Sequence, residues 1–328
     1  MFPTAGRAGQ GRSARGTPTA SADGHSNRAF VMILVLTGPQ RLMKTRPAAG
    51  ACAGRQCLLG HLSDQQVEMA VAPAGSALTV DLPSSGTGAH PMQTPEALNA
   101  AFVSGNSHTV VVESLRTAGA RSVLDIGCGG GRLVARLSAE GFAAAGVDPH
   151  APAVEAARNK TPAAQFAVSG AQSLPFDPAS FDAAVFLNSL HHVPVDEMGK
   201  ALDEAGRVVR EGGAILIVEP LAEGSYFETM RPIEDETAIR HAAGVAIADA
   251  VREGRFRLRG NVVFRETVRF KNVDEFLSRL VAVDASRAGA AERLHDEIET
   301  HFRLQSQQDG DHFKLVQPLR IYWLAVGN

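Results

Sequence analysis

Residues Val123–Arg132 read Val-Leu-Asp-Ile-Gly-Cys-Gly-Gly-Gly-Arg, and this stretch decides the fold. A short apolar run carries one acid and then breaks into glycines, and an amphipathic segment, Leu133–Glu140, follows directly. This order predicts a strand, a tight turn and the start of a helix. Glycine lets the main chain approach a ligand closely because it has no Cβ. The first N–H groups of the helix then point toward whatever lies over the turn.

The charge beside this turn narrows the class of ligand. Asp125 stands two residues before the first glycine, Gly127. A dinucleotide pyrophosphate would be repelled by this carboxylate, whereas a ligand that carries an ammonium group would be attracted by it. The turn therefore favours an ammonium-bearing ligand over a dinucleotide.

From Met92 onward, apolar runs alternate with segments of helical period. The expected strands are 122–126, 143–147, 165–168, 183–187 and 214–219, and the expected helices between them are 132–140, 152–159 and 196–209. After residue 220 we expect an irregular helical stretch, a strand over 262–270, helices after Asn272 and near 290–302, and a final strand over 313–326. The sequence thus predicts an α/β fold with a Rossmann-like, doubly wound sheet, mostly parallel with an antiparallel C-terminal edge strand.

The first ninety residues differ in composition from the rest. Residues 1–60 hold eight basic residues and one acid among many Gly, Ala, Pro, Ser and Thr. Such a stretch cannot bury enough apolar surface to offset chain entropy. We expect residues 1–91 to be a disordered or non-native N-terminal extension. A targeting segment stays open as an alternative, because the apolar run 30–36 follows an Arg-rich start.

Charge and cysteine content exclude several classes of function. Residues 92–328 carry 24 basic and 31 acidic residues, a formal net charge of −7, so we expect no nucleic-acid partner. The three cysteines give neither a disulfide framework nor a paired metal-ligand spacing, which predicts no metal and a cytoplasmic location. No apolar run approaches the roughly 20 residues that a membrane span requires. The oligomeric state cannot be read from these features.

Four short segments stand where the expected strands end. The glycine turn follows the first strand, and Asp148-Pro149 ends the second. An acid at that point suits hydrogen bonding to the hydroxyls of a ribose. The third segment is Gly-Ala-Gln-Ser-Leu-Pro-Phe over 170–176, and the fourth is Asn-Ser-Leu-His-His-Val over 188–193. Ligands of open α/β sheets bind at the carboxyl ends of strands, so these segments predict one shared site.

Together these segments resemble the class I S-adenosylmethionine-dependent methyltransferases, in particular the small-molecule branch called methyltransferase type 11. The resemblance covers residues 105–220 closely and 220–328 only in general layout. It implies an enzyme that transfers a methyl group from S-adenosyl-L-methionine to an O, N or C atom of a small molecule. It also implies a methyltransferase domain over 92–328, with a lid insertion at about 221–260.

The resemblance assigns a role to each segment. The cofactor-binding residues that it implies are Asp125 for the ammonium group, Gly127 and Gly129 for the methionine end, Asp148 for the ribose, Ala171 and Gln172 for the adenine, and the main chain of Asn188 for the methionyl part. Cys128 and Pro149, next to these residues, are also expected to bind the cofactor. One position departs from the family pattern. The residue before Ala171 is often an acid that accepts from the adenine amino group, but here it is Gly170. This contact is then weakened, or it passes to Ser169 or a main-chain carbonyl.

Histidines supply the candidates for a catalytic base. His191 and His192 follow the fourth expected strand, at the end of the sheet where the ligand binds. A histidine suits deprotonation of an acceptor because its pKa lies near neutrality. A structural role for this pair stays open. His108, before the first strand, and His241, in the lid stretch, are further candidates.

Two other functions compete with methyl transfer. A non-catalytic binding protein could keep the methyltransferase fold, and Gly170 together with the unassigned base favours that alternative. An NAD-dependent oxidoreductase also uses a glycine turn and an acid on the second strand. The third glycine of the dinucleotide-binding motif would fall on Arg132, and the charge of Asp125 fits an NAD-dependent oxidoreductase poorly.

Overall fold

The computed structural model describes residues 95–327, and every structural statement below concerns this range. The predicted extension over 1–91 lies outside the described residues. The elements in chain order are α1 (Pro95–Ser104), α2 (Ser107–Thr117), β1 (Ser122–Ile126), α3 (Arg132–Ala139), β2 (Ala143–Asp148), α4 (Ala151–Lys160), β3 (Gln165–Val168), β4 (Phe181–Leu187), η1 (Leu190–His192), η2 (Val195–Glu197), α5 (Met198–Val208), β5 (Val209–Pro220), α6 (Ser225–Met230), α7 (Thr237–Arg252), β6 (Phe256–Phe270), α8 (Val273–Val283), η3 (Ala285–Arg287), α9 (Ala288–Arg293), α10 (His295–Gln305), β7 (Gln307–Asp309) and β8 (His312–Val326).

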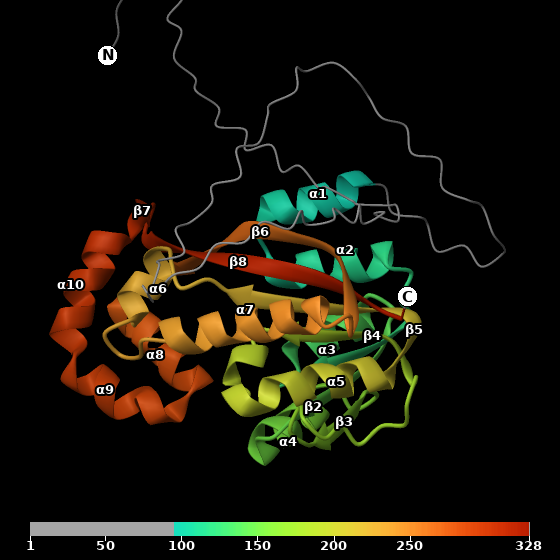
Figure 1. The fold of residues 1–328 in the computed structure, drawn as a ribbon. Coiled ribbons are helices and arrows are strands. Elements are labelled where there is room, and N and C mark those ends of the chain that lie inside the picture. The colour runs from blue at the N-terminus through green and yellow to red at the C-terminus, as the bar shows by residue number, and fades with distance from the viewer. Residues whose placement is uncertain (1–94, 328) are drawn as a thin grey trace, which may run out of the picture. The chain divides into compact units, whose positions relative to one another are not determined.

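The strands form one mixed sheet in the order β3-β2-β1-β4-β5-β8-β6, with β7 paired to β8 (Figure 1). The pairs among β1 to β5 are parallel, and β8 runs antiparallel to both β5 and β6. The order reverses between β1 and β4, which is where an open α/β sheet binds its ligand. The predicted Rossmann-like sheet with an antiparallel edge region is therefore confirmed.

The final strand does not itself form the edge of the sheet. β8 lies between β5 and β6, so β6 is the outermost antiparallel strand. β6 also begins six residues earlier than the alternation predicted, at Phe256, which is buried. The register with β8 shifts between Leu258 and Gly260. This irregularity interrupts the period-2 pattern, which separates the first six residues of β6 from the predicted strand over 262–270.

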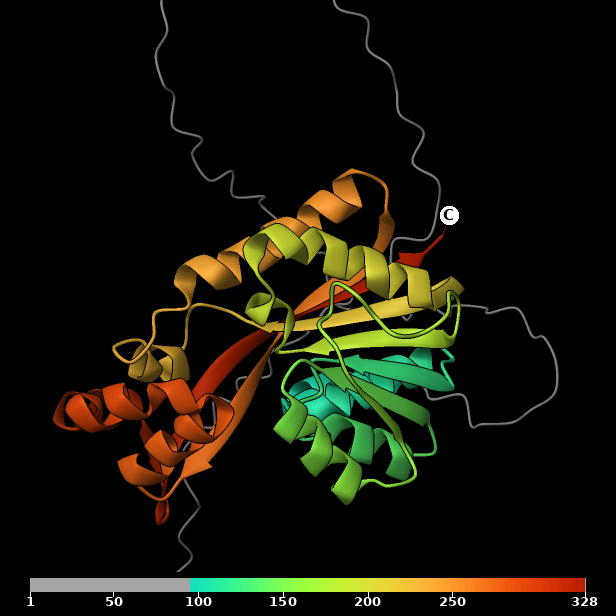
Figure 2. The same cartoon turned by 90° about the horizontal axis from the view of Figure 1, so that it is seen from below.

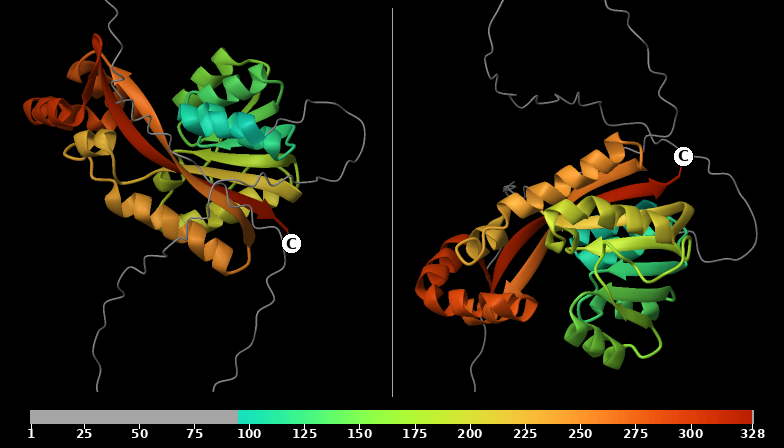
Figure 3. Two further views of the ribbon diagram at one scale, coloured as in Figure 1. Left: turned by 90° about the horizontal axis from the view of Figure 1, so that it is seen from above. Right: turned by 60° about the horizontal axis from the view of Figure 1, so that its bottom comes forward.

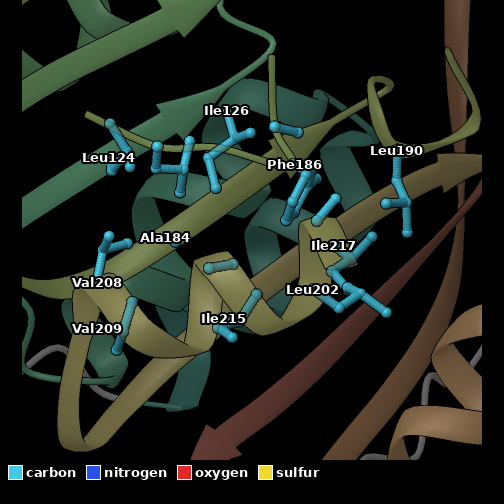
Figure 4. Close-up of a cluster of buried hydrophobic side chains, with 14 of the residues drawn as sticks. Leu124, Ile126, Ala184, Phe186, Leu190, Leu202, Val208, Val209, Ile215 and Ile217 are labelled. Atoms are coloured by element: carbon cyan, nitrogen blue, oxygen red, sulfur yellow. The ribbon is translucent and has the colours of Figure 1, made fainter. Parts of the chain in front are cut away.

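Helices cover both faces of the sheet (Figure 3). On one face, α5 and α7 pack against β1, β4 and β5 in a large apolar cluster. Figure 4 shows ten labelled members of this cluster, among them Ile126 and Phe186 from the strands and Leu202 from α5. On the other face, α1, α2 and α3 pack against the same strands. Because the strands are buried on both sides, they read as nearly continuous apolar runs.

A separate apolar cluster lies where β6 and β8 extend beyond the parallel strands. It joins α6, α8, α9 and α10 around aromatic side chains such as Phe270, Phe276 and Phe302. Figure 2 shows these helices gathered at the end of the β6–β8 ribbon, apart from the green helices beside the parallel strands. We call residues 225–230, 273–305 and the adjoining ends of β6 and β8 the helical lobe. The C-terminal part therefore contains a packed group of helices in addition to the antiparallel strands that the sequence predicted.

The stretch predicted as a lid, 221–260, contains α6, α7 and the first residues of β6. Its two helices belong to different clusters, because α6 packs in the helical lobe and α7 packs on the main sheet. A role as cover for an acceptor stays a prediction. Within residues 95–327, no helix combines the length and the apolar character needed to cross a bilayer.

Candidate functional site

The glycine turn is tied to the neighbouring strand by its own main chain. The N–H groups of Gly127 and Cys128 both donate to the carbonyl of Val147, at 2.8 and 2.9 Å. Gly127 has a φ of +79° and Gly129 a φ of +49°, backbone angles that favour glycine. The turn therefore has a fixed position over the ends of β1 and β2.

One glycine is required by a close approach from β4. A Cβ on Gly127 would lie 2.5 Å from the Cβ of Ser189, which real Cβ atoms do not tolerate. The Ser189 hydroxyl donates to the carbonyl of Ile126 at 2.6 Å, so the segment after β4 rests directly on the turn. A Cβ on Gly129 or Gly130 would meet nothing within 4 Å. Bare main chain on that side is left accessible to a ligand.

The side chain of Asp125 lies at the carboxyl end of β1. Asp125 is 2% exposed. Burial raises the pKa of its carboxyl to about 7, and the nearby charge of Asp148 adds to the rise. Within residues 95–327, no hydrogen bond stabilises this carboxylate. A buried carboxylate without a partner is costly, and a bound cation would offset that cost.

Asp148, at the end of β2, holds the turn from the other side. One carboxylate oxygen accepts from the N–H of Gly129 at 2.8 Å, and the other accepts from the N–H of His150 at 2.9 Å. Each carboxylate oxygen has a second lone pair. Asp148 can thus order the turn and still accept from the hydroxyls of a ligand.

The structure brings most of the sequence-predicted residues to this edge of the sheet. Pro149 is exposed beside Asp148, and Ala171 is buried in the main cluster. The main chain of Asn188 has a φ of +53°, and its N–H donates to the carbonyl of Val218 at 2.8 Å. Gln172 lies half-buried next to Ala171.

The thiol of Cys128 points away from the turn's open side. A Cβ on Gly146 would lie 2.8 Å from its sulfur, and Cys128 packs with Phe166 in a small apolar cluster. Burial raises the pKa of the thiol above its usual value, and the charges of Asp125 and Asp148 raise it further. The thiol therefore packs in the protein interior.

The two adjacent histidines have different surroundings. His191 is buried, and its Nδ1 contacts a carboxylate oxygen of Glu219, the acid near the end of β5. The other oxygen of Glu219 accepts from the N–H of Leu190 at 2.9 Å. His192 is exposed and stacks against the His191 ring, with centroids 4.1 Å apart. Although part of His192 is exposed, the protein around its ring excludes some of the water, which lowers its pKa, and His191 lowers it further.

A buried ion network beside these histidines has no counterpart among the predicted site residues. Glu236 accepts from Arg240 at 2.6 Å and from Arg287 at 2.8 Å, and all three side chains are nearly fully buried. Burial alone would raise the pKa of Glu236, but Arg240, His191 and Arg287 hold it below its usual value. Glu219 could have been found as an acid ending an apolar strand. Arg287 lies far along the chain with no local signal.

The other two histidines lie apart from this pair. His108 is half-buried on α2, where burial and then the charges of Arg132 and Arg136 lower its pKa. This places it near the start of α3 and so near the glycine turn. His241 is exposed on α7.

Comparison with known proteins identifies the region that contains this site. A family model described as "Methyltransferase domain" matches residues 124–217, which run from β1 into β5. Residues 124–217 are thus similar to a methyltransferase domain.

The chain spans less than half of the length of each of two methyltransferase relatives that it matches. An uncharacterized methyltransferase of Mycobacterium tuberculosis is 33% identical over 107 residues, which is 33% of this chain and 43% of the relative. The 27-O-demethylrifamycin SV methyltransferase of Amycolatopsis mediterranei is 35% identical over 102 residues, 29% of this chain and 37% of the relative. Among solved structures, the YcgJ protein of Bacillus subtilis has a TM-score of 0.49 at 20% identity, covering 68% of this chain and 99% of that one.

Proposed function

We propose that this methyltransferase transfers the methyl group of S-adenosylmethionine to an O, N or C atom of a small molecule. The observation that carries the proposal is the buried Asp125 carboxylate, which has no hydrogen bond within residues 95–327 and lies beside bare glycine main chain. An NAD pyrophosphate would add negative charge at that point, whereas the methionyl ammonium group of S-adenosylmethionine would offset the carboxylate. A non-catalytic role would leave the polar groups after β4 unexplained.

The residues present fit the cofactor that the family implies. Asp125 and the glycine turn would hold its methionyl end, Asp148 would accept from its ribose hydroxyls, and Ala171 and Gln172 would flank its adenine. When bound, S-adenosylmethionine supplies a methyl group activated by the sulfonium. The Asn188 main chain completes the methionyl side, since it is fixed to β5 through Val218.

The chain's own contribution to the reaction is to orient the acceptor and to take its proton. Effective positioning of reacting atoms requires separations of about 3 to 3.5 Å. His192 would act as the catalytic base, and the buried His191, fixed by Glu219, would position it. We also propose that residues 221–260 cover the acceptor, because α7 packs against η1 and Glu236 acts electrostatically on His192.

A small-molecule acceptor is supported by the relative named for 27-O-demethylrifamycin SV. It is also supported by the acidic balance of residues 92–328, which disfavours nucleic acid. A cytoplasmic location stays a prediction from cysteine content.

Ligand titration tests the proposal directly. We expect calorimetry of the whole chain to show binding of S-adenosylmethionine and S-adenosylhomocysteine and no response to NAD. Mass spectrometry of a cell lysate incubated with the protein and labelled cofactor should then reveal a methylated product. Binding of NAD alone would overturn the assignment, and cofactor binding without any product would favour the non-catalytic alternative.

Cofactor affinity should depend on pH through Asp125. Burial and the charge of Asp148 raise the pKa of this carboxyl from 3.8 to about 7. Cys128 is the other titratable group that interacts with the Asp125 charge. The ammonium group of the ligand prefers the ionised form of Asp125, so the affinity for S-adenosylhomocysteine should rise about tenfold from pH 6 to pH 8.

By the same linkage, the free energy of unfolding of the unliganded protein should fall as pH rises from about 4 to 7. Calorimetry at both pH values checks the binding effect, and Asp125→Asn should flatten it; an equal slope in that variant would assign it to another group.

Asp148→Ala should weaken cofactor binding by about 1 to 3 kcal/mol, because it removes a charged acceptor from the ribose. The variant also frees the N–H groups of Gly129 and His150. Calorimetric titration with S-adenosylhomocysteine measures the loss. Asp177→Ala, at an exposed position before β4, is the matched control and should bind like the wild type. An unchanged dissociation constant in Asp148→Ala would remove this residue from the site.

A further inference from the structure

Two arginines lie close together on one face of the antiparallel ribbon formed by β6 and β8. In the ladder between these strands, Val263 pairs with Arg320, and Arg265 pairs with Pro318. Residues that pair directly project their side chains to the same face, and diagonal neighbours lie about 7 to 8 Å apart. Arg265 and Arg320 are diagonal neighbours. Their side chains therefore leave the sheet on one face, within reach of a single ligand.

The acid nearest to this pair in the ladder is already engaged. Glu219 of β5 pairs with Arg320 on the other side of β8, so its side chain shares the same face. Its two oxygens serve the N–H of Leu190 and Nδ1 of His191. Within residues 95–327, no acid forms an ion pair with either arginine, and Nε of Arg320 is buried without a hydrogen-bond partner.

The arginine pair is accessible from the β6 side. In the row formed by Glu219, Arg320 and Val263, the exposed fraction rises from 5% at Glu219 to 40% at Val263. Arg320 is half-buried between them, and Arg265 is exposed. The Cζ atom of Arg320 lies 5.9 Å from the ring centroid of Tyr322, the next residue of β8 on this face. A ligand can therefore reach both guanidinium groups in the folded protein.

Two neighbouring guanidinium groups without acidic partners favour an anion. Their positive charges repel each other, and an anion between them would offset that repulsion. The buried Nε of Arg320 has lost contact with water without gaining a hydrogen bond, which is costly. Arginine also presents a planar fork of donors that matches a carboxylate or a phosphate. The pair thus has the charge, the donors and the access that an anion-binding site requires.

The strand order places this pair beside the proposed catalytic base. Arg320 lies next to Glu219, which contacts the His191 ring on which His192 stacks. In the order β4-β5-β8-β6, Arg320 is two strands from the end of β4, where the η1 histidines follow (Figure 1). Neighbouring strands lie about 4.8 Å apart, so this separation is roughly 10 Å. A small molecule can span it.

We propose that Arg265 and Arg320 bind a carboxylate or phosphate group of the methyl acceptor, which is therefore an anionic small molecule. The inference rests on the proposed function, because it assumes that the reacting atom of the acceptor faces His192. The anionic group is held at β6 and β8 while the reacting atom lies at the end of β4. The group that the arginines bind is thus not the group that receives the methyl, and the product keeps its negative charge.

Binding of small anions to the complex with S-adenosylhomocysteine tests the site directly. The probes are benzoate and phenyl phosphate, with benzamide as the neutral analogue. Calorimetry should show that the wild type binds at least one of the anions more tightly than benzamide. Arg320→Gln and Arg265→Gln should each weaken that anion about ten- to a hundredfold, the loss of a charged hydrogen bond, and leave benzamide unchanged. The anion that binds more tightly identifies the group as a carboxylate or a phosphate.

Three controls separate recognition of the anion from damage to the fold. Arg257→Gln, at an exposed position near the other end of β6, is the matched control and should bind like the wild type. Arg320→Lys keeps the charge but loses the planar fork, so its affinity should lie between those of the wild type and Arg320→Gln. Thermal unfolding of the unliganded variants should match the wild type, and all of them should bind S-adenosylhomocysteine equally well.

The methylated product gives an independent test. Labelled product formed in a cell lysate should be retained on an anion exchanger at pH 7. A product that is not retained, or anions that bind no more tightly than benzamide, overturns the anion site while the cofactor assignment stands. An unchanged affinity for the anion in both Arg265→Gln and Arg320→Gln overturns it as well. Failure of the wild type to bind S-adenosylhomocysteine overturns the proposed function itself.

Discussion

His192→Ala is expected to lower turnover by about a hundredfold near neutral pH, the usual contribution of a positioned general base. Affinity for S-adenosylhomocysteine should stay within about threefold of wild type, since His192 lies in η1, after β4, and not among the residues assigned to the ribose and adenine. Calorimetry with that ligand and initial rates of product formation measure the two effects separately.

The pH profile gives this prediction a sharper test. The surroundings of His192 lower its pKa from 6.5, through loss of water and through His191, so the neutral base persists below that value. Wild-type turnover should fall as pH drops through this lowered pKa, and the fall should be absent in His192→Ala. His301→Ala, on α10, is the matched control. If His192→Ala turns over as fast as the wild type across the whole pH range, His192 is not the catalytic base.

The central sheet was predictable because local sequence and tertiary context agree there. Ser122–Ile126 and Gln165–Val168 were predicted as strands with the bounds that the structure shows. Each is a short apolar run bounded by turn residues, and burial on both faces leaves little ambiguity. Asp125 and Asp148 stand at strand ends for the same reason, so their positions could be inferred from spacing alone.

The helical lobe could not be predicted in the same way. Its core joins Phe227 of α6 to Phe276 of α8 and Phe302 of α10, across contacts far apart in the chain. Arg287 likewise reaches Glu236 from 51 positions away. Such pairings depend on the position of these helices relative to the β6–β8 ribbon. Hydrophobic periodicity contains no information on the relative positions of helices that are far apart in the chain.

Glu219→Ala is expected to cost about 2 to 4 kcal/mol of unfolding free energy, the largest stability loss predicted for a residue in this region. Glu219 is 5% exposed, and its two oxygens serve Leu190 and His191. Truncation leaves the Leu190 N–H and the His191 ring buried without their partner. Removing one member of a buried pair costs more than the pair contributes, because the remaining polar groups stay out of water.

The same substitution should separate positioning from cofactor binding. Once Glu219 is lost, nothing fixes Nδ1 of His191, and the His192 ring that stacks on it loses its support. We expect turnover to fall with the pH profile displaced, while affinity for S-adenosylhomocysteine changes less than about threefold. Urea unfolding and calorimetry measure these effects. Glu219→Gln keeps the shape and one acceptor oxygen and should recover most of the stability. Glu211→Ala, an exposed acid on the same strand, should unfold like wild type. If Glu219→Ala proves as stable as Glu211→Ala, the carboxylate does not hold the segment after β4, and His191 must be oriented by packing alone.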